Sequence, residues 1–422
     1  MDPQACGLDG CIKCTICTQV CPVAQRSPFY PGPKAGGPDA ERFRRTGHRD
    51  DESWTDLCSG CKLCELACPS GVRVAGMNLD AKSVWVRKNG LSPVTRLLVN
   101  AERLNRLSAP FAGLQNPVLA HPLLRKALEA GIGLNAQRPL PRNQRDRFRR
   151  WARERQKRRK PVNGLNAEQI AYFFGCYTDS HAPSIGKTVV KCLEALGCAV
   201  EFPRQGCCGI ARIASGDWKG AEKIARRNTR WMNEVFARGI PVLFSSPSCG
   251  LALKHEYEAL FHSAGTGYLP QAHFCDVFEF LLDFRDQAIR PGALEPVPAR
   301  VYYHAACHLK ALGIGFPAVE ILRRIPALEV ILLDTGCCGL AGTFGFKQDR
   351  YPLSMKMGSD LLETLRRVSP DFVVSECEGC RMQIEHGSGL AAVHPIEILA
   401  RALSISVSSP RPSASKAPST GS

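Results

Sequence analysis

Two copies of one cysteine pattern, C-x2-C-x2-C-x3-C-P, constrain the N-terminal part of the chain. The copies are CIKCTICTQVCP at residues 11–22 and CSGCKLCELACP at residues 58–69. The x2 spacing lets three thiolates of one tight loop reach three irons of a [4Fe–4S] cube. The fourth cysteine, just before the proline, ligates the other cluster in two-cluster ferredoxins. The pattern therefore predicts two [4Fe–4S] clusters whose motifs exchange their last ligand.

This exchange divides the motif cysteines between two predicted clusters. The first cluster is expected to bind Cys11, Cys14, Cys17 and Cys68. The second cluster is expected to bind Cys58, Cys61, Cys64 and Cys21. Zinc sites or disulfides are the alternative, but zinc sites usually present their cysteines as separated pairs. Cys6 lies outside the pattern, and we interpret it as a bystander thiol.

Residues 167–404 contain an internal repeat. One copy runs AYFFGCY, GCCGIA, LFSSPSC, and the other runs VYYHAAC, GCCGLAG, VVSECEGC. From the first cysteine to the Cys-Cys pair the distance is 31 residues in one copy and 30 in the other. From that pair to the next cysteine it is 41 and 39 residues. Short apolar runs alternate with helical patterns, which predicts an α/β unit in each copy. The cysteines follow the expected strand ends, where α/β sheets usually place ligands.

Each copy presents a Cys-Cys-Gly turn and further thiols. Adjacent cysteines can bind different irons of one cluster, and Gly209 or Gly339 permits a close backbone approach or a positive φ. The second copy offers Cys307, Cys337, Cys338, Cys377 and Cys380 as ligands of an additional [4Fe–4S] cluster. The first copy offers Cys176, Cys207, Cys208 and Cys249, with Ala252 where the second copy has its last cysteine. Buried structural thiols or a redox disulfide are the alternative for each pair.

Two histidines, His304 and His308, flank Cys307. We expect both to be structural histidines with satisfied hydrogen bonds. A role as ligand or proton donor is the alternative.

The chain has 422 residues, of which 44% are hydrophobic and 22% charged, so we predict a multidomain globular protein of α+β and α/β type. An N-terminal, two-cluster, ferredoxin-like helical domain precedes a duplicated α/β Cys-Cys-Gly domain. The expected parts are the ferredoxin-like domain (1–78), a helical and basic linker region (79–166), the first repeat (167–290), the second repeat (298–404) and a disordered tail (405–422).

The chain carries 21 cysteines but no export signal before its first motif, so we expect a cytoplasmic protein whose thiols serve metal. No apolar run is long enough to predict a transmembrane segment. No G-x-G-x-x-G follows a strand, and there is no P-loop. The chain therefore shows no flavin or nicotinamide site of its own, and we expect the substrate to be oxidised on a partner subunit.

A net charge of +16 favours an anionic partner. Residues 142–160 hold eleven Lys or Arg against two acids and supply +9 of that excess. We hypothesise that this basic run binds an anionic membrane surface, with Trp151 at the headgroups and the helical stretch 93–133 beside it. A solvated linker helix, or docking onto an acidic partner subunit, is the alternative. We expect no nucleic acid, because no nucleic-acid-binding fold is recognisable.

A family resemblance rests on four segments. They are CIKCTICTQVCPVAQRSPFYPGPKAGGPDAERFR from residue 11, the two Cys-Cys-Gly repeats, GTFGFKQDRYP at 342–352 and HPIEILARAL at 394–403. Together they resemble the family of C subunits of anaerobic glycerol-3-phosphate dehydrogenases. The resemblance implies an electron-transfer subunit of anaerobic respiration and glycerol metabolism, peripheral on the cytoplasmic face of the inner membrane. Flavin-containing subunits A and B would oxidise glycerol 3-phosphate, and this chain would pass the electrons to membrane quinone.

The wider family includes the B subunits of heterodisulfide reductases, whose Cys-Cys-Gly domains bind non-cubane [4Fe–4S] clusters. The resemblance carries that cluster type to the thiols of the second copy, whereas the four thiols of the first copy suit an ordinary cube. Three rival interpretations remain open. They are an iron–sulfur subunit of a glycolate or lactate oxidase, a heterodisulfide-reductase-like enzyme, and a structural zinc protein.

Overall fold

The computed structural model describes residues 10–47, 53–158, 168–263, 273–368 and 370–406. Cys6, the last two residues of the basic run and nearly all of the predicted tail lie outside these ranges. Within the described ranges, no helix is both long and apolar enough to cross a bilayer.

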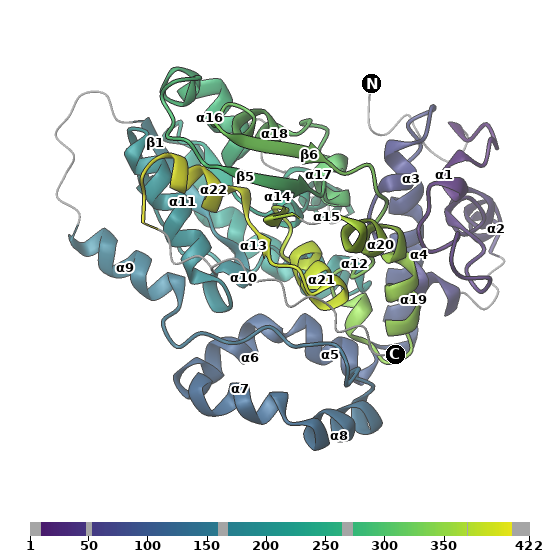
Figure 1. Cartoon of the computed structure of the whole chain (residues 1–422). Coiled ribbons are helices and arrows are strands. Elements are labelled where there is room, and N and C mark those ends of the chain that lie inside the picture. Colours follow the sequence, from purple (N-terminus) through teal and green to yellow (C-terminus); the bar gives the residue numbers. More distant parts are fainter. Residues whose placement is uncertain (1–9, 48–52, 159–167, 264–272, 369, 407–422) are drawn as a thin grey trace, which may run out of the picture.

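The internal repeat forms two four-stranded sheets of the same topology, and all strand pairs in them are parallel (Figure 1). The first sheet has the order β2-β1-β3-β4, with β1 (Glu168–Phe173), β2 (Cys198–Glu201), β3 (Val242–Phe244) and β4 (Phe274–Asp276). The second has the order β6-β5-β7-β8, with β5 (Ala299–Tyr303), β6 (Leu328–Leu332), β7 (Phe372–Val374) and β8 (Ala392–Val393). The predicted duplication of an α/β unit is thereby confirmed.

Helices flank both sheets, which explains why β3 and β7 are buried at every position. The first repeat contains α10 (Gly175–Ser180), α11 (Pro183–Ala195), α12 (Ile210–Ala214), α13 (Trp218–Phe236), α14 (Pro247–Leu251), the π-helical turn η5 (Ala252–Glu256), α15 (Tyr257–Ser263), α16 (Val277–Arg285) and η7 (Asp286–Ile289). The second contains α17 (Cys307–Leu312), α18 (Pro317–Leu322), η8 (Phe344–Phe346), α19 (Tyr351–Met357), α20 (Ser359–Arg367), α21 (Glu378–Ser388) and α22 (Pro395–Ala402).

The two repeats share one hydrophobic core. Ile170 and Tyr172 of the first sheet belong to the same buried cluster as Val301 and Tyr303 of the second. Burial of this continuous apolar surface holds the two sheets in a fixed relation, because separating them would expose it to water.

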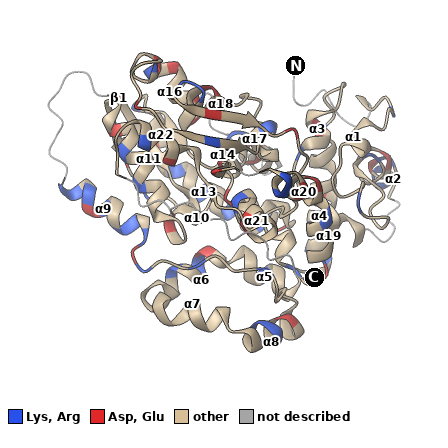
Figure 2. Ribbon diagram, viewed as in Figure 1, with Lys and Arg blue, Asp and Glu red and all other residues tan. Residues whose placement is uncertain are grey.

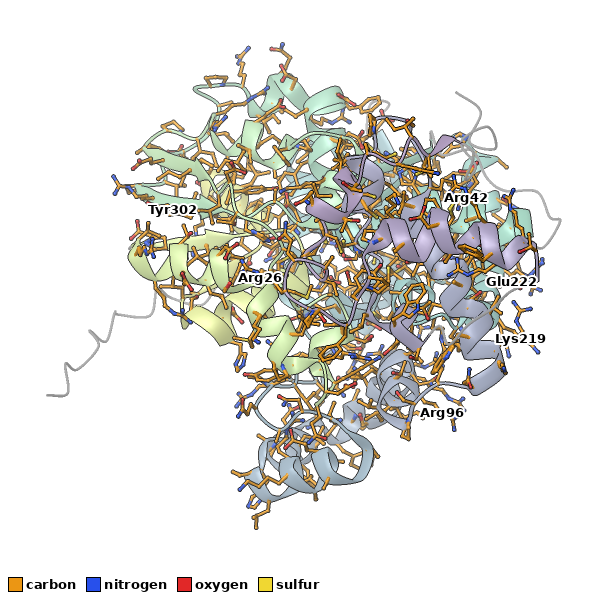
Figure 3. The ribbon with its side chains drawn as sticks, turned by 90° about the vertical axis from the view of Figure 1, so that its right-hand side faces the viewer. Arg26, Arg42, Arg96, Lys219, Glu222 and Tyr302 are labelled. Atoms are coloured by element: carbon orange, nitrogen blue, oxygen red, sulfur yellow. The ribbon has the colours of Figure 1, made fainter. Side chains whose placement is uncertain are left out.

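Short elements make up the cysteine-rich N-terminal region. They are α1 (Ile16–Gln19), η2 (Ala35–Asp39), α2 (Ala40–Arg45), η3 (Ser53–Leu57) and α3 (Leu63–Leu66), followed by the long α4 (Val74–Asn89). This region packs against both repeats. Arg26, labelled in Figure 3, pairs with Asp360 of α20 at 2.7 Å, and Lys62 pairs with Glu256 of the first repeat at 2.7 Å.

A layer of short helices lies beneath the two repeats in the view of Figure 1. It comprises α5 (Pro93–Val99), α6 (Ala101–Ser108), η4 (Ala109–Phe111), α7 (Ala112–Ala120) and α8 (Pro122–Ile132), where the apolar spacing predicted helix. Ser92 begins α5 by accepting a hydrogen bond from Thr95 N, with Pro93 at the first helical position. The end of this layer joins the second repeat, because Leu134 forms a β-bridge with Lys347.

The described part of the basic run forms α9 (Phe148–Arg158), whose cations are visible in Figure 2. Its inner face is anchored to the first repeat: Phe148 is fully buried, and Asp179 accepts from Arg147 and Arg149. Trp151 packs against Phe148 with ring centroids 5.4 Å apart. Trp151 is thus half-buried at the edge of the protein's own core, and its place at lipid headgroups stays a prediction.

Candidate metal centres

The two four-cysteine motifs adopt the same backbone conformation. Lys13 and Thr15 have φ of 59° and 65°, and the equivalent Gly60 and Lys62 have 70° and 62°. Left-handed residues other than glycine are sparse and cost energy, so they persist where the surroundings over-determine them. Each loop thus curls around its own cysteines at a conformational cost, as expected of a segment that wraps a bound group.

The second predicted ligand set lines a single cavity. Its walls contain all four of its thiols, namely Cys21, Cys58, Cys61 and Cys64. Tyr30 also lines the cavity and donates a hydrogen bond to Asn78 Oδ1 at 3.2 Å. The wall therefore combines cysteines of both motifs, as the exchange of the last ligand requires. Ligation itself stays a prediction.

The thiols of the first predicted set also lie together. Burial raises the pKa of Cys17, and the charges of Cys11 and Cys14 add to the rise. Cys11 and Cys68 pack against the apolar cluster that contains both Cys17 and Cys64. Because Cys64 belongs to the second set, the two sites are neighbours. Cys14 is the exposed member of the first set.

In the first repeat, the four candidate thiols converge at the carboxyl edge of the sheet. The Sγ atoms of Cys207 and Cys176 are 3.6 Å apart. Hydrogen bonds to Cys207 and Cys249 raise the pKa of Cys208 well above its usual range. A Cβ on Gly175 would lie 2.9 Å from Cys249 Sγ, so this backbone must approach the thiols closely.

In the second repeat, all five candidate thiols gather around the Cys-Cys-Gly turn. Cys337 hydrogen-bonds with Cys307 and Cys338, and Cys380 with Cys338 and Cys377. These hydrogen bonds from Cys337 and Cys380 lower the pKa of Cys338 to about 5. No disulfide joins any of the 20 cysteines that the structure describes.

The glycine of each Cys-Cys-Gly turn has a positive φ, as predicted: 87° at Gly209 and 91° at Gly339. A Cβ on Gly339 would lie 2.1 Å from the carbonyl oxygen of Ser354. Only glycine therefore satisfies both the conformation and the close approach at this turn.

A buried cation beside the second repeat fits an anionic group. Arg138 is 1% exposed, and its guanidinium donates to Gly345 O at 3.1 Å, to Ser354 Oγ at 3.2 Å and to Gln383 Oε1. No carboxylate pairs with Arg138 among the described residues. Burial lowers the pKa of this guanidinium to about 10, whereas the charges of Tyr351 and Cys338 act to raise it.

A buried charge is costly unless a counter-charge accompanies it. An iron–sulfur cluster held by thiolates is anionic and would supply that charge to Arg138. The donor set of the second repeat, soft thiolates beside an otherwise uncompensated cation, therefore fits such a cluster.

The candidate sites follow one another through the molecule. Burial raises the pKa of Cys61 to about 12, and the nearby charge of Cys307 is the next cause. Cys337 shares an apolar cluster with Cys21 and Cys58. The second four-cysteine motif is thus adjacent to the second repeat, a relation that the sequence did not predict.

The two repeats also bring their own sites together. Ser248 of the first repeat precedes Cys249, and its Oγ lies 2.9 Å from His308 Nδ1 and 4.0 Å from Cys377 Sγ. The candidate cysteines of the first repeat therefore face those of the second across the interface between the repeats.

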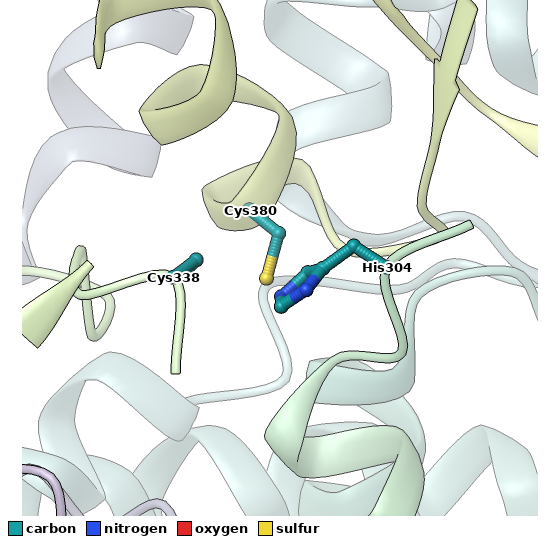
Figure 4. A group of neighbouring side chains, drawn as sticks. All are labelled: His304, Cys338 and Cys380. Atoms are coloured by element: carbon teal, nitrogen blue, oxygen red, sulfur yellow. The ribbon is translucent and has the colours of Figure 1, made fainter. Parts of the chain in front are cut away.

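The two histidines beside Cys307 differ. His308 is hydrogen-bonded through Nδ1, as expected of a structural histidine. His304 is 1% exposed, and its Nδ1 has no hydrogen-bond partner in the described part of the chain. The expectation that both are satisfied is wrong for His304, which lies instead beside Cys338 and Cys380 (Figure 4).

Sequence reasoning missed Lys82 as well as Arg138. The buried Lys82 Nζ donates to the carbonyl oxygens of Cys58 and Ala214, the latter at 2.9 Å, and so ties the second motif to the first repeat. Nothing in the sequence marks these two cations among 55 Lys and Arg. Their roles depend on burial, which local patterns do not reveal.

Comparisons with known proteins match the same regions of the sequence. The 4Fe-4S dicluster domain family matches residues 7–72, and the Cysteine-rich domain family matches residues 170–254 and 301–385. The C subunit of anaerobic glycerol-3-phosphate dehydrogenase from Escherichia coli K12 is 36% identical over 403 residues, covering 94% of this chain and 98% of that protein. Lactate utilization protein A of Anoxybacillus flavithermus is 28% identical over 243 residues, covering 54% of this chain and 98% of that protein.

Proposed function

Because the chain belongs to the family of C subunits of anaerobic glycerol-3-phosphate dehydrogenases, we propose that it passes electrons from flavin-containing subunits A and B to a membrane quinone. It is an iron–sulfur subunit of this type of dehydrogenase. The lactate utilization proteins resemble only about half of the chain, 54% in the case above, so a lactate oxidase subunit fits less well.

The observation that carries this proposal is that the candidate cysteine sets lie next to one another in a row through the protein. This row runs from exposed Cys14 through the first motif to the second, and from Cys61 to Cys307 in the second repeat. Two [4Fe–4S] clusters in the motifs and a third in the second repeat would supply single-electron redox chemistry. The protein's part is to hold the thiols close together and to bury them from water.

The ligand sets remain those predicted from the motifs. Residues 1–78 would form the ferredoxin-like domain, and 79–166 a helical linker region. Residues 167–290 and 298–404 would form the two Cys-Cys-Gly domains.

A partner-facing surface is proposed at the first motif. Ile12, Ile16 and Leu66 expose 66%, 41% and 55% of their area, and Cys14 is exposed between Ile12 and Ile16. Contiguous exposed apolar patches mark interaction sites in soluble proteins, and α1, which carries Ile16, packs against α3, which carries Leu66. We assign this face to a flavin-containing subunit, since electrons would reach the chain at the most exposed cysteine.

A membrane-facing surface is proposed on α6, η4 and α7. A stripe of exposed apolar side chains with spacings of three and four residues runs along these helices, made of Leu104, Leu107, Phe111, Leu114 and Val118. An exposed apolar face of this kind suits the headgroup–acyl boundary of a bilayer. The cations of α9 would favour anionic lipid (Figure 2). The chain would then be peripheral on the cytoplasmic face of the inner membrane.

The proposal is tested with anaerobically purified chain, its flavin subunits, glycerol 3-phosphate and a quinone in anionic vesicles. We expect quinone reduction to require this chain. Cys61→Ser should block quinone reduction yet leave dye reduction by the flavin subunits intact. The control Cys192→Ala removes a fully buried thiol outside all predicted sets and should retain activity.

Quinone reduction at the same rate without the chain would refute the electron-transfer role. Disulfide cleavage by the isolated, reduced chain would favour the heterodisulfide-reductase-like alternative instead.

A further inference from the structure

His304, beside the thiols of the second repeat, has a ring nitrogen without a hydrogen-bond partner among the described residues. A ring nitrogen of His304 and the Sγ atoms of Cys338 and Cys380 lie within 4.8 Å of one another, and all three side chains are buried. Figure 4 shows the imidazole next to the Cys380 sulfur. These residues come from three separate segments, so their meeting is a product of the fold and not of local sequence.

The backbone holds His304 firmly at this place. It directly follows β5, and its N–H donates to Val374 O at 2.9 Å, which continues the pairing of β5 with β7. The imidazole therefore starts at the carboxyl edge of the sheet, where the thiols converge. A buried polar atom left without a partner is energetically costly, because it has lost its hydrogen bonds to water. Such a cost calls for an explanation, and a bound group is one.

We propose that His304 is a nitrogen ligand, through Nδ1, of the metal centre that the thiols of the second repeat bind. This inference rests on the proposed function, since it presupposes a cluster in that repeat. The centre would then have mixed cysteine and histidine ligands.

The chemistry of the group supports this assignment. A neutral imidazole keeps a lone pair on one ring nitrogen, and Nδ1 of the buried His304 has no hydrogen-bond partner among the described residues. Neutral imidazole is a common ligand of iron. In iron–sulfur centres, histidine in place of thiolate removes negative charge and raises the reduction potential. A higher potential would suit the last centre before a quinone.

The first repeat lacks this feature. Between the end of β1 and Cys176 it has Phe174 and Gly175, neither of which offers a side-chain ligand. In their candidate ligands the two repeats therefore differ by Cys380 and His304, and the proposal predicts a nitrogen ligand in the second repeat alone.

The test is pulsed EPR on the anaerobic full-length chain, with its histidines labelled with ¹⁵N. The signal of the second repeat is the one lost in Cys337→Ser. We expect this signal to show a strongly coupled histidine nitrogen that is lost in His304→Ala. The matched control is His308→Ala, because His308 also flanks Cys307 in the sequence but already has a hydrogen-bond partner, and this variant should keep the coupling.

His304→Cys adds a second readout. It should retain iron, lose the nitrogen coupling and lower the midpoint potential of this centre, since an anionic ligand replaces a neutral one. Should His304→Ala fail to fold, the labelled wild-type chain still decides the question.

The outcomes separate this inference from the proposed function. A second-repeat signal without strong histidine coupling, or with coupling that persists in His304→Ala, would overturn only the histidine ligand. About eight irons per chain, with no signal lost in Cys337→Ser, would mean that only the two motifs hold clusters. That result would overturn both this inference and the third cluster.

Discussion

Lys62 Nζ lies 2.7 Å from Glu256 Oε1, and this ion pair joins the second four-cysteine motif to the first repeat. The two side chains are only 11% and 5% exposed. Glu65 lies 3.4 Å from the same ammonium. Lys62 also has the positive φ that curls the motif between Cys61 and Cys64. The ion pair therefore fixes the loop that carries two predicted ligands against the body of the protein.

Glu256→Gln should destabilise the protein markedly. Removing one partner of a buried ion pair leaves an uncompensated charge and typically costs about 3–5 kcal/mol, and the nearby Glu65 should reduce that figure. The measurement is the midpoint of thermal unfolding of anaerobic, cluster-loaded protein. Glu222→Gln is the control, because Glu222 (labelled in Figure 3) forms an exposed pair with Arg226. Equal midpoints for both variants would contradict a structural role of the buried pair.

Because the motifs are expected to exchange their last ligand, the EPR species that a Cys→Ser variant alters should not follow the motif in which the cysteine lies. Cys21→Ser should alter the same EPR species as Cys58→Ser, although Cys21 belongs in sequence to the first motif. Cys68→Ser should act like Cys11→Ser for the same reason. Cys192→Ala, the buried thiol outside all sets, should change neither species. If Cys21→Ser instead grouped with Cys11→Ser, each motif would bind its own cluster.

The repeat and its thiol placement could be predicted because cysteine spacing reports topology directly. Strands of the two copies are parallel, so thiols that follow different strands meet at one edge. Cys176 and Cys249 follow β1 and β3, and Cys307 and Cys377 follow β5 and β7. Only the alternation of strand and helix was needed to place them.

The relation between Cys61 and Cys307 could not be predicted, because it depends on packing between distant segments. The two histidines beside Cys307 were indistinguishable in sequence for the same reason. His308 lies in the first turn of α17 and reaches Ser248 of the other repeat, whereas His304 directly follows β5 and lies beside Cys338. The basic run likewise gave no sign that Arg147 binds a buried carboxylate.

The contribution of Asp276 to the stability of the protein should fall as the pH rises from about 4 to about 8. Burial, followed by the charge of Glu376, raises the pKa of Asp276 to about 8. An unfolded aspartate has a pKa of about 4, so in this window the folded state keeps a proton that the unfolded state releases. The contribution of Asp276 is present in full below that unfolded value. It falls by up to about 1.4 kcal/mol per pH unit until the folded pKa is passed.

Asp276→Asn should reduce this slope and still accept the hydrogen bond from Phe278 N at 2.8 Å. Thermal midpoints of anaerobic protein across the window measure the effect. The exposed Asp286, changed to Asn, is the control. An unchanged slope in Asp276→Asn would contradict the raised pKa.

Arg138 should raise the reduction potential of the centre in the second repeat. Its buried positive charge faces Cys338 and favours the more negative, reduced state. Arg138→Gln should lower the midpoint potential by an amount on the order of tens of millivolts. Arg138→Lys keeps the charge and should shift it less. Arg125→Gln removes another buried guanidinium, whose bonds go to Asn135 O and Arg138 O, and should leave the potential unchanged. Equal shifts in Arg138→Gln and Arg125→Gln would point to general loosening of the fold.

Membrane binding should depend chiefly on the apolar stripe. Leu107, Phe111 and Leu114 expose 66%, 68% and 70% of their area, and changing all three to Ser removes this surface without disturbing the core. Each apolar side chain buried in the bilayer contributes about 1.5–3 kcal/mol to binding. The affinity for anionic vesicles, measured by sedimentation, should therefore fall at least about a hundredfold. Phe284→Ser, which removes an exposed aromatic on α16, is the control and should bind like wild type. Undiminished sedimentation of the triple variant would exclude lipid as the occupant and assign the stripe to a partner subunit.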